Sequence, residues 1–145
     1  MGPAVATARG ADGLITLDTS SIVALVQTGD PNHARTVAAF RADPGPHVVP
    51  ASILAEVAYV LESRVGLQAV TAFLLDLDSG ALAFDCGEGD FARIAELVLR
   101  YDDLPLGTAD AGVIACAERR GARVLTLDRR HFDVVGREID LEVLP

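Results

Sequence analysis

Short apolar runs along the chain alternate with longer segments in which apolar residues recur every three or four positions. The short runs are typical of buried strands, and the longer pattern is typical of helices that pack on a sheet. The runs predict strands at 14–18, 47–50, 81–85, 123–127 and 141–144. The periodic segments predict helices at 20–28, 31–43, 52–65, 67–78, 88–101 and 108–120. Strands that alternate with helices predict an α/β sandwich with a mainly parallel central sheet flanked by helices.

The ends of the predicted helices carry residues that commonly start or stop a helix. Ser20, Ser52 and Thr108 stand where a hydroxyl can cap a helix N-terminus. Glycines follow several of the predicted helices, as is typical of helix C-termini. Residues 1–13 show no such pattern and are predicted to be a flexible tail, whereas residues 14–145 are predicted to form a single domain.

Length and composition narrow the class of protein. The 145 residues suit one domain with a sizeable core. No uncharged apolar run is long enough for a membrane span, and the N-terminal segment does not resemble a signal peptide, so a cytoplasmic protein is expected. Cys86 and Cys116 are isolated, which argues against a disulfide framework or a zinc site. The three histidines show no pairing at metal-ligand spacing.

Charge excludes further classes. The chain contains no lysine, which excludes a phosphate-binding loop of the Walker type and catalysis through a lysine Schiff base. The net charge of −9 argues against broad, non-specific binding to nucleic acid. Five arginines fall within residues 119–130, so the net charge does not exclude a local basic patch there. Surface roles for Arg129 and Arg130 are an equally good interpretation.

Two of the predicted strands end in the same three residues, Thr-Leu-Asp. Asp18 ends the first of them and Asp128 follows the strand at 123–127. Ligands of parallel α/β sheets bind beyond the carboxyl ends of the strands. The repeated ending therefore predicts that these two carboxylates lie side by side at one edge of the sheet.

Two further acids occupy positions that suggest a site. Glu56 lies on or beside the apolar side of the predicted 52–65 helix, and Asp110 lies in the first turn of the small-residue helix 108–120. Each acid also has a structural interpretation. Asp110 could stabilise the helix dipole, Asp18 could help cap a helix, Asp128 could form a turn and Glu56 could pair with an arginine.

If the four acids converge, they need a cation. Two carboxylates about 4 Å apart repel by about 4 kcal/mol when the effective dielectric constant is about 20. Ligation by oxygen alone favours Mg²⁺ or Mn²⁺, and such an ion can activate water for attack on a phosphate. The neighbouring hydroxyls of Thr19, Ser20 and Thr126 could orient a carboxylate or a water.

Four segments occur in the order and spacing of a PIN domain: "LDTSSIVAL", "ILAEVAYVL", "LGTADAGVIACAERRG" and "VLTLDRRHF". The chain from about residue 14 onward resembles the VapC ribonuclease toxins of bacterial toxin–antitoxin pairs. This resemblance implies a compact α/β/α sandwich, metal-dependent cleavage of RNA, a homodimer and a VapB-type antitoxin that blocks the site. The arginines of 119–130 are then expected to guide the RNA backbone. Apolar surplus on segments 21–26 and 70–75 also favours association with a partner.

The resemblance places the catalytic acids at Asp18, Glu56, Asp110 and Asp128, with Asp18 and Asp110 as the expected direct ligands of Mg²⁺ or Mn²⁺. Two other functions compete with a toxin ribonuclease. A catalytically silent PIN-type module could bind RNA or a partner protein, although it would be expected to lack one of the acids. A phosphatase on a similar sheet would be expected to carry a lysine, which the chain lacks, and an Asp-x-Asp motif at 18–20, where Asp-Thr-Ser stands.

Overall fold

A five-stranded parallel sheet forms the centre of the protein. The computed structural model describes residues 13–145. The strands are β1 (Ile15–Leu17), β2 (His47–Pro50), β3 (Leu82–Asp85), β4 (Arg123–Leu125) and β5 (Glu142–Leu144). Their order across the sheet is β3-β2-β1-β4-β5, and each neighbouring pair is parallel. The predicted parallel α/β sheet is therefore confirmed, with strands that are one or two residues shorter at five of the ten predicted ends.

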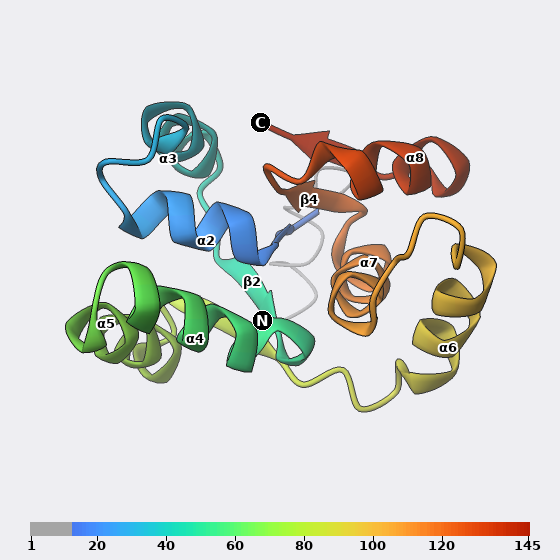
Figure 1. The fold of residues 1–145 in the computed structure, drawn as a ribbon, viewed down its shortest axis with the longest axis horizontal. Coiled ribbons are helices and arrows are strands. Elements are labelled where there is room, and N and C mark those ends of the chain that lie inside the picture. The colour runs from blue at the N-terminus through green and yellow to red at the C-terminus, as the bar shows by residue number, and fades with distance from the viewer. Residues whose placement is uncertain (1–12) are drawn as a thin grey trace, which may run out of the picture.

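Helices flank the sheet on both sides. They are α2 (Thr19–Val26), α3 (His33–Ala42), α4 (Leu54–Arg64), α5 (Leu67–Ser79), α6 (Phe91–Arg100), α7 (Thr108–Arg120) and α8 (Arg129–Ile139), with a 3₁₀ turn, η2 (Ala51–Ile53), before α4. In Figure 1 the helices α2 to α5 lie on one side of the strands and α6 to α8 on the other. Helix α7 packs against β1, β4 and β2, and α6 packs against α7. The result is the expected α/β/α sandwich.

Helix α8 is absent from the sequence-based prediction. Its residues follow Asp128 directly and include three arginines, a histidine and Gly136, a composition that weakens the signal for a helix. The structure nevertheless buries Phe132 completely from this helix. A Cβ atom at Gly136 would lie 3.1 Å from Val143 Cγ2, so the glycine allows α8 to pack closely on β5. Tertiary packing therefore stabilises a helix that local preference only weakly favours.

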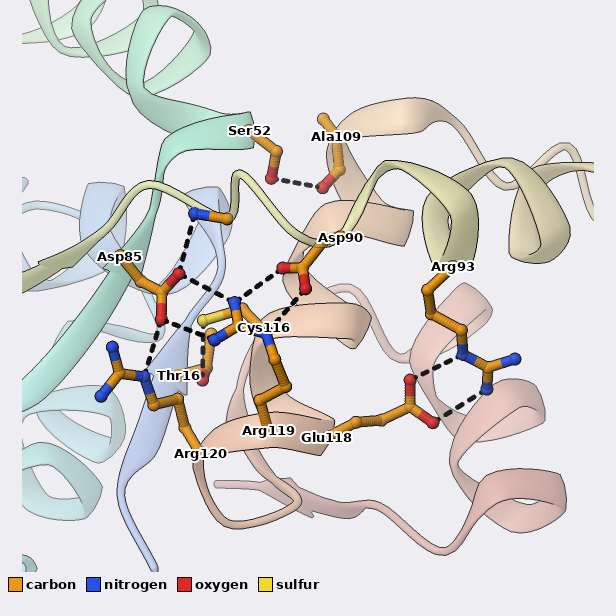
Figure 2. Close-up of polar contacts among 11 residues, drawn as sticks. Thr16, Ser52, Asp85, Asp90, Arg93, Ala109, Cys116, Glu118, Arg119 and Arg120 are labelled. Carbon is orange, nitrogen blue, oxygen red and sulfur yellow. Dashed lines mark hydrogen bonds and ion pairs between the residues drawn. The ribbon is translucent and has the colours of Figure 1, made fainter.

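The predicted helix caps at Ser20, Ser52 and Thr108 are wrong. None of these hydroxyls caps a helix, because Ser20 lies inside α2, Ser52 lies within η2 and Gly107 precedes α7. Ser52 Oγ instead donates to Ala109 O at 3.0 Å (Figure 2). A Cβ atom at Gly112 would lie only 2.3 Å from Ser52 Cβ, so the glycine permits this close approach. The turn η2 and the start of α7 are thereby held together.

The two segments predicted to carry surplus apolar surface, 21–26 and 70–75, differ in the exposure of their apolar side chains to solvent. Ile22 and Val23 of α2 are buried in the core, so that part of the prediction is wrong. Leu74 and Leu75 of α5 are exposed, as the prediction required. The surplus arises on α5 because one side of this helix packs on β3 and α4 and the other faces outward.

Residues 1–12, which include nearly all of the predicted flexible tail, lie outside the described residues. Within residues 13–145, no helix combines the length and the apolar character that crossing a membrane would require.

Candidate active site

The four predicted acids line one pocket of about 350 Å³ at the carboxyl ends of β1 and β4. Asp18 directly follows β1, and Asp128 lies just before α8. Glu56 lies in the first turn of α4 and Asp110 in the first turn of α7. The chain thus brings one carboxylate from each of four elements into a common space, as the repeated Thr-Leu-Asp ending and the two helix positions predicted.

Asp18 is held in place by two hydroxyl groups. Its side chain is buried, and its Oδ2 accepts hydrogen bonds from Thr126 Oγ1 at 2.8 Å and from Ser20 Oγ at 3.0 Å. Each hydroxyl in turn accepts a backbone N–H: Leu127 donates to Ser20 Oγ at 2.9 Å, and Asp128 donates to Thr126 Oγ1 at 3.0 Å. Because the hydroxyl protons are directed to Asp18, the loop after β4 and the first carboxylate are fixed relative to each other.

Burial and crowding of negative charge alter the titration of two of the acids. Burial is the largest cause that raises the pKa of Asp18, and together with the charge of Asp110 it brings this pKa to about 6 against the lowering effect of the two hydroxyls. Burial also raises the pKa of Asp110, with smaller raising contributions from Asp128 and Glu56. These are the shifts expected of carboxylates that face one another without a cation.

His131 is part of the site, although the sequence suggested no pairing for it. Its Nδ1 lies 3.0 Å from Asp110 Oδ2 and 3.6 Å from Asp128 Oδ2. With its proton on Nδ1, the imidazole donates a hydrogen bond to Asp110, and this bond lowers the pKa of Asp110. The available signal was the spacing of three residues between Asp128 and His131, which places both on one side of a helix. That signal required α8 to be recognised.

Glu56 differs from the aspartates because it is exposed. It faces the pocket from α4 and accepts a hydrogen bond from the hydroxyl of Thr19. Glu56 is expected to lie on or beside the apolar side of its helix. Its neighbour Val57 is buried on that side, whereas Glu56 itself retains access to solvent.

The predicted basic patch does not form at the pocket. Arg119 and Arg120 bind the buried Asp85, and Arg119 also binds Asp90 (Figure 2). Arg123 likewise pairs with Asp43 and Glu142, and Arg129 with Asp133. The expectation that the arginines of 119–130 jointly guide RNA is therefore wrong for these four, because they neutralise carboxylates of the fold.

The residues of the pocket fit a hard divalent cation. Carboxylate oxygens are the ligands that Mg²⁺ and Mn²⁺ prefer. Asp110, Asp128 and His131 each offer a ligand atom, and these atoms lie within 4.8 Å of one another. Of the two predicted direct ligands, Asp110 belongs to this group, whereas Asp18 lines the same pocket outside it. A cation here would offset the repulsion that contributes to the raised pKa values of Asp18 and Asp110.

Comparisons with known proteins agree with this fold and pocket. The PIN domain family matches residues 15–138, which defines the class. Ribonuclease VapC26 of Mycobacterium tuberculosis (strain ATCC 25618 / H37Rv) is 35% identical over 121 residues, which cover 82% of this chain and 90% of that protein. The chain therefore belongs to the PIN-domain family and, within it, to the VapC ribonuclease toxins.

Two solved structures share the fold. VapC20 of Mycobacterium tuberculosis, described as a sarcin-ricin loop cleaving toxin, superposes with a TM-score of 0.76 at 23% identity, over 84% of this chain and 95% of that one. FitAcB from Neisseria gonorrhoeae superposes with a TM-score of 0.61 at 19% identity, over 91% of this chain and 97% of that one. At these identities the superpositions support the α/β/α architecture alone.

Proposed function

We propose that this protein is a cytoplasmic endoribonuclease that depends on Mg²⁺ or Mn²⁺ and acts as the toxin of a type II toxin–antitoxin pair. The observation that carries the proposal is the pocket in which four carboxylates from β1, α4, α7 and the start of α8 meet. The names of two similar proteins, a ribonuclease and a toxin that cleaves the sarcin-ricin loop, support RNA as the substrate.

Within the proposed site, each side chain has a separate task. Asp18 and Asp110 hold the ion, and Asp128 completes its surroundings. Ser20 and Thr126 orient Asp18 through their hydrogen bonds to Oδ2. When bound, a divalent ion supplies Lewis acidity toward the phosphate and lowers the pKa of water.

Glu56 is the residue best placed to accept a proton. Its carboxylate is exposed at the pocket rim and is oriented by the Thr19 hydroxyl. In the proposed reaction the oxygen of a water attacks phosphorus, Glu56 accepts the proton of that water, and the bond from phosphorus to the 3′-oxygen breaks. The 3′-oxygen takes a proton from solvent, so the products carry a 5′-phosphate and a 3′-hydroxyl.

The test is to incubate antitoxin-free protein with transfer and ribosomal RNA in Mg²⁺, in Mn²⁺ and in EDTA. Cleavage is expected only with metal. Asp110→Asn should abolish it, and Glu56→Gln should slow it by about 10²–10⁴-fold in a folded protein. Asp103→Asn, which changes an exposed loop carboxylate, is the matched control and should cleave normally. Cleavage in EDTA, or 2′,3′-cyclic phosphate ends, would overturn the mechanism, and RNA binding without cleavage in either metal would indicate a silent module.

The same proposal includes a homodimer and a VapB-type antitoxin. Large apolar side chains are exposed on α4 and α5, among them Tyr59, Leu67 and Leu75, and exposed apolar surface commonly marks an interface. An arginine of the antitoxin could occupy the carboxylate pocket, since a cation satisfies its electrostatics. Light scattering at micromolar concentration should give the mass of a dimer, and a monomer would refute this part alone.

A further inference from the structure

One arginine lines the acidic pocket. Arg64 lies in the last turn of α4 and contributes to the pocket wall together with Val60 and Glu56. These three residues are spaced by four positions, so they follow one side of the helix. Helical side chains also tilt toward the N-terminus of their helix, which inclines Arg64 toward Val60 and the carboxylates.

Arg64 is also free to bind a ligand. Among residues 13–145, no carboxylate lies within ion-pairing distance of its guanidinium. Six other arginines of the same range are paired with acids of the fold: Arg93, Arg100, Arg119, Arg120, Arg123 and Arg129. An exposed, unpaired guanidinium beside a pocket of four acids is available to an anion that enters the pocket.

The net charge makes such a contact necessary. At −9, the protein repels an RNA backbone at long range, and the pocket carboxylates repel it locally. A divalent ion can neutralise the phosphate that reacts, but the flanking phosphates need a cation of the protein. Arg64 is the only arginine among the residues that line this pocket in the described part of the chain, and the chain has no lysine.

We infer that Arg64 binds a phosphate of the RNA strand that flanks the phosphate being cleaved. This inference rests on the proposed ribonuclease function. Glu56 and Arg64 are eight residues apart, which is about 12 Å along the helix axis. The guanidinium therefore contacts a neighbouring phosphate rather than the reacting one, and its two-pronged N–H groups match phosphate oxygens. Arg64 is a substrate-binding residue in this scheme, not a catalytic one.

The test compares Arg64→Ala, Arg64→Lys and Arg64→Glu with Arg41→Ala. Arg41 is a matched control because it is an arginine without a described ion pair that lines a different, apolar pocket. Binding of a short fluorescein-labelled single-stranded RNA is measured by anisotropy in Ca²⁺ at several salt concentrations. KM and kcat are measured in Mg²⁺ on RNA that the wild-type protein cleaves.

Arg64→Ala should weaken RNA binding about ten-fold, as for a hydrogen bond to a charged group. It should raise KM by the same factor without changing kcat, and Arg64→Lys should restore most of the affinity. The slope of the logarithm of affinity against the logarithm of salt concentration should fall by about 0.7, as for one lost contact to a single strand. Arg41→Ala should match the wild type throughout.

Unchanged affinity and salt slope in Arg64→Ala would overturn the inference, and so would a fall in kcat at constant KM. A lower melting temperature with normal RNA affinity would assign Arg64 a structural role at the end of α4 and would also overturn it. Failure of the wild-type protein to cleave RNA would refute the proposed function instead, while the binding measurements in Ca²⁺ would still decide the role of Arg64.

Discussion

Helix α7 begins at one cluster of aspartates and ends at another, and the two clusters have opposite electrostatics. At its start, Asp110 shares the pocket with Asp18, where burial raises the pKa of Asp18 to about 6. At its end, Arg119 and Arg120 bind the buried Asp85 (Figure 2). There, hydrogen bonds from Arg119 and Arg120 outweigh burial and lower the pKa of Asp85 to about 2.

The difference lies in the partners, because both Asp18 and Asp85 are nearly inaccessible to solvent. Asp85 has two guanidinium groups of the chain as partners, so its charge stabilises the folded state. The donors to Asp18 are neutral, two hydroxyl groups and the backbone N–H of Thr19, and the charge that acts on it is that of another carboxylate, Asp110. A buried carboxylate without a cation of the protein destabilises the fold unless an external cation binds. The first cluster is therefore suited to a ligand and the second to holding α7 against the loop after β3.

The largest expected effect concerns the stability of the metal-free protein. Because the pKa of Asp18 is raised, the folded state holds a proton that the unfolded chain has lost between about pH 4 and pH 6. The free energy of unfolding should therefore fall by about 3 kcal/mol as pH rises through this range. Asp18→Asn should abolish most of this fall, since the amide oxygen can still accept both hydroxyl protons.

Urea unfolding in EDTA at several pH values measures this effect. Added Mg²⁺ at pH 7 should restore stability to the wild-type protein but much less to Asp18→Asn. Asp103→Asn, at an exposed position, should behave as the wild type. A wild-type stability that is constant across the range, or that rises with pH in EDTA, would contradict the description of Asp18 as an unpaired buried acid.

The second prediction removes a cation from the other cluster. Arg119→Met leaves Asp90 without its guanidinium and Asp85 with Arg120 alone. Loss of one partner of a buried ion pair typically lowers the free energy of unfolding by about 3–5 kcal/mol. Because Arg119 is partly exposed, the expected decrease here is about 2 kcal/mol. RNA cleavage by the folded variant should be unchanged.

The control is Arg100→Met, because Arg100 and Glu138 form a pair in which both side chains are about half exposed. Such an exposed pair should contribute less than about 1 kcal/mol to the free energy of unfolding. Because the pKa of Asp85 is lowered, its ionised carboxylate stabilises the folded state fully above about pH 4. This stabilisation is lost as pH falls toward about 2. If urea unfolding shows that Arg119→Met is no more destabilising than Arg100→Met, the cluster is not the stabilising element inferred here.

The smallest expected effect concerns His131, the only titratable base that contacts the first cluster in the described residues. Removal of a group that orients a metal-binding carboxylate typically reduces metal affinity or activity about ten-fold or more. His131→Ala should therefore weaken Mg²⁺ binding about ten-fold by calorimetry and lower kcat similarly. His131→Asn, which can still donate to Asp110, should recover part of both.

His33→Ala is the comparison variant, because His33 Nδ1 bonds to Ala24 O at 2.7 Å and lies outside the pocket-lining residues. It should affect stability alone. Equal Mg²⁺ affinity in His131→Ala and the wild type would show that the imidazole only fills space beside Asp110.

Local signals were sufficient for most of the fold and for the four acids. The apolar runs predicted all five strands, and the identical endings at Asp18 and Asp128 predicted a shared sheet edge. These inferences succeeded because strand burial and the geometry of a parallel sheet depend on short segments. The helix α8 was missed because the buried Phe132 stabilises it through packing on distant residues.

Side-chain partners were predicted less well, and the arginines show why. Arg119 and Arg130 are near each other in sequence, yet Arg119 pairs with acids more than 25 residues away, while Arg130 is exposed. Arg64 gave no signal in the sequence, and the spacing of His131 from Asp128 becomes a signal only once α8 is recognised, although both residues line or contact the acidic cluster. Charge partners depend on which elements meet in space, and sequence distance does not encode that.

The sequence by itself determined the alternation of strands and helices, the family and the identity of the four acids, because each is written in residue type and local spacing. Only the tertiary structure decided which charges remain without a partner. Asp85 ends β3 and Asp18 follows β1, so both lie at carboxyl ends of strands, and both are buried. The packing of α7 brings two arginines to Asp85, whereas it brings another carboxylate, Asp110, to Asp18, whose side-chain donors are hydroxyls. Electrostatic energy depends on distances between groups far apart in the chain, so folding alone distinguishes a structural aspartate from one that awaits a cation.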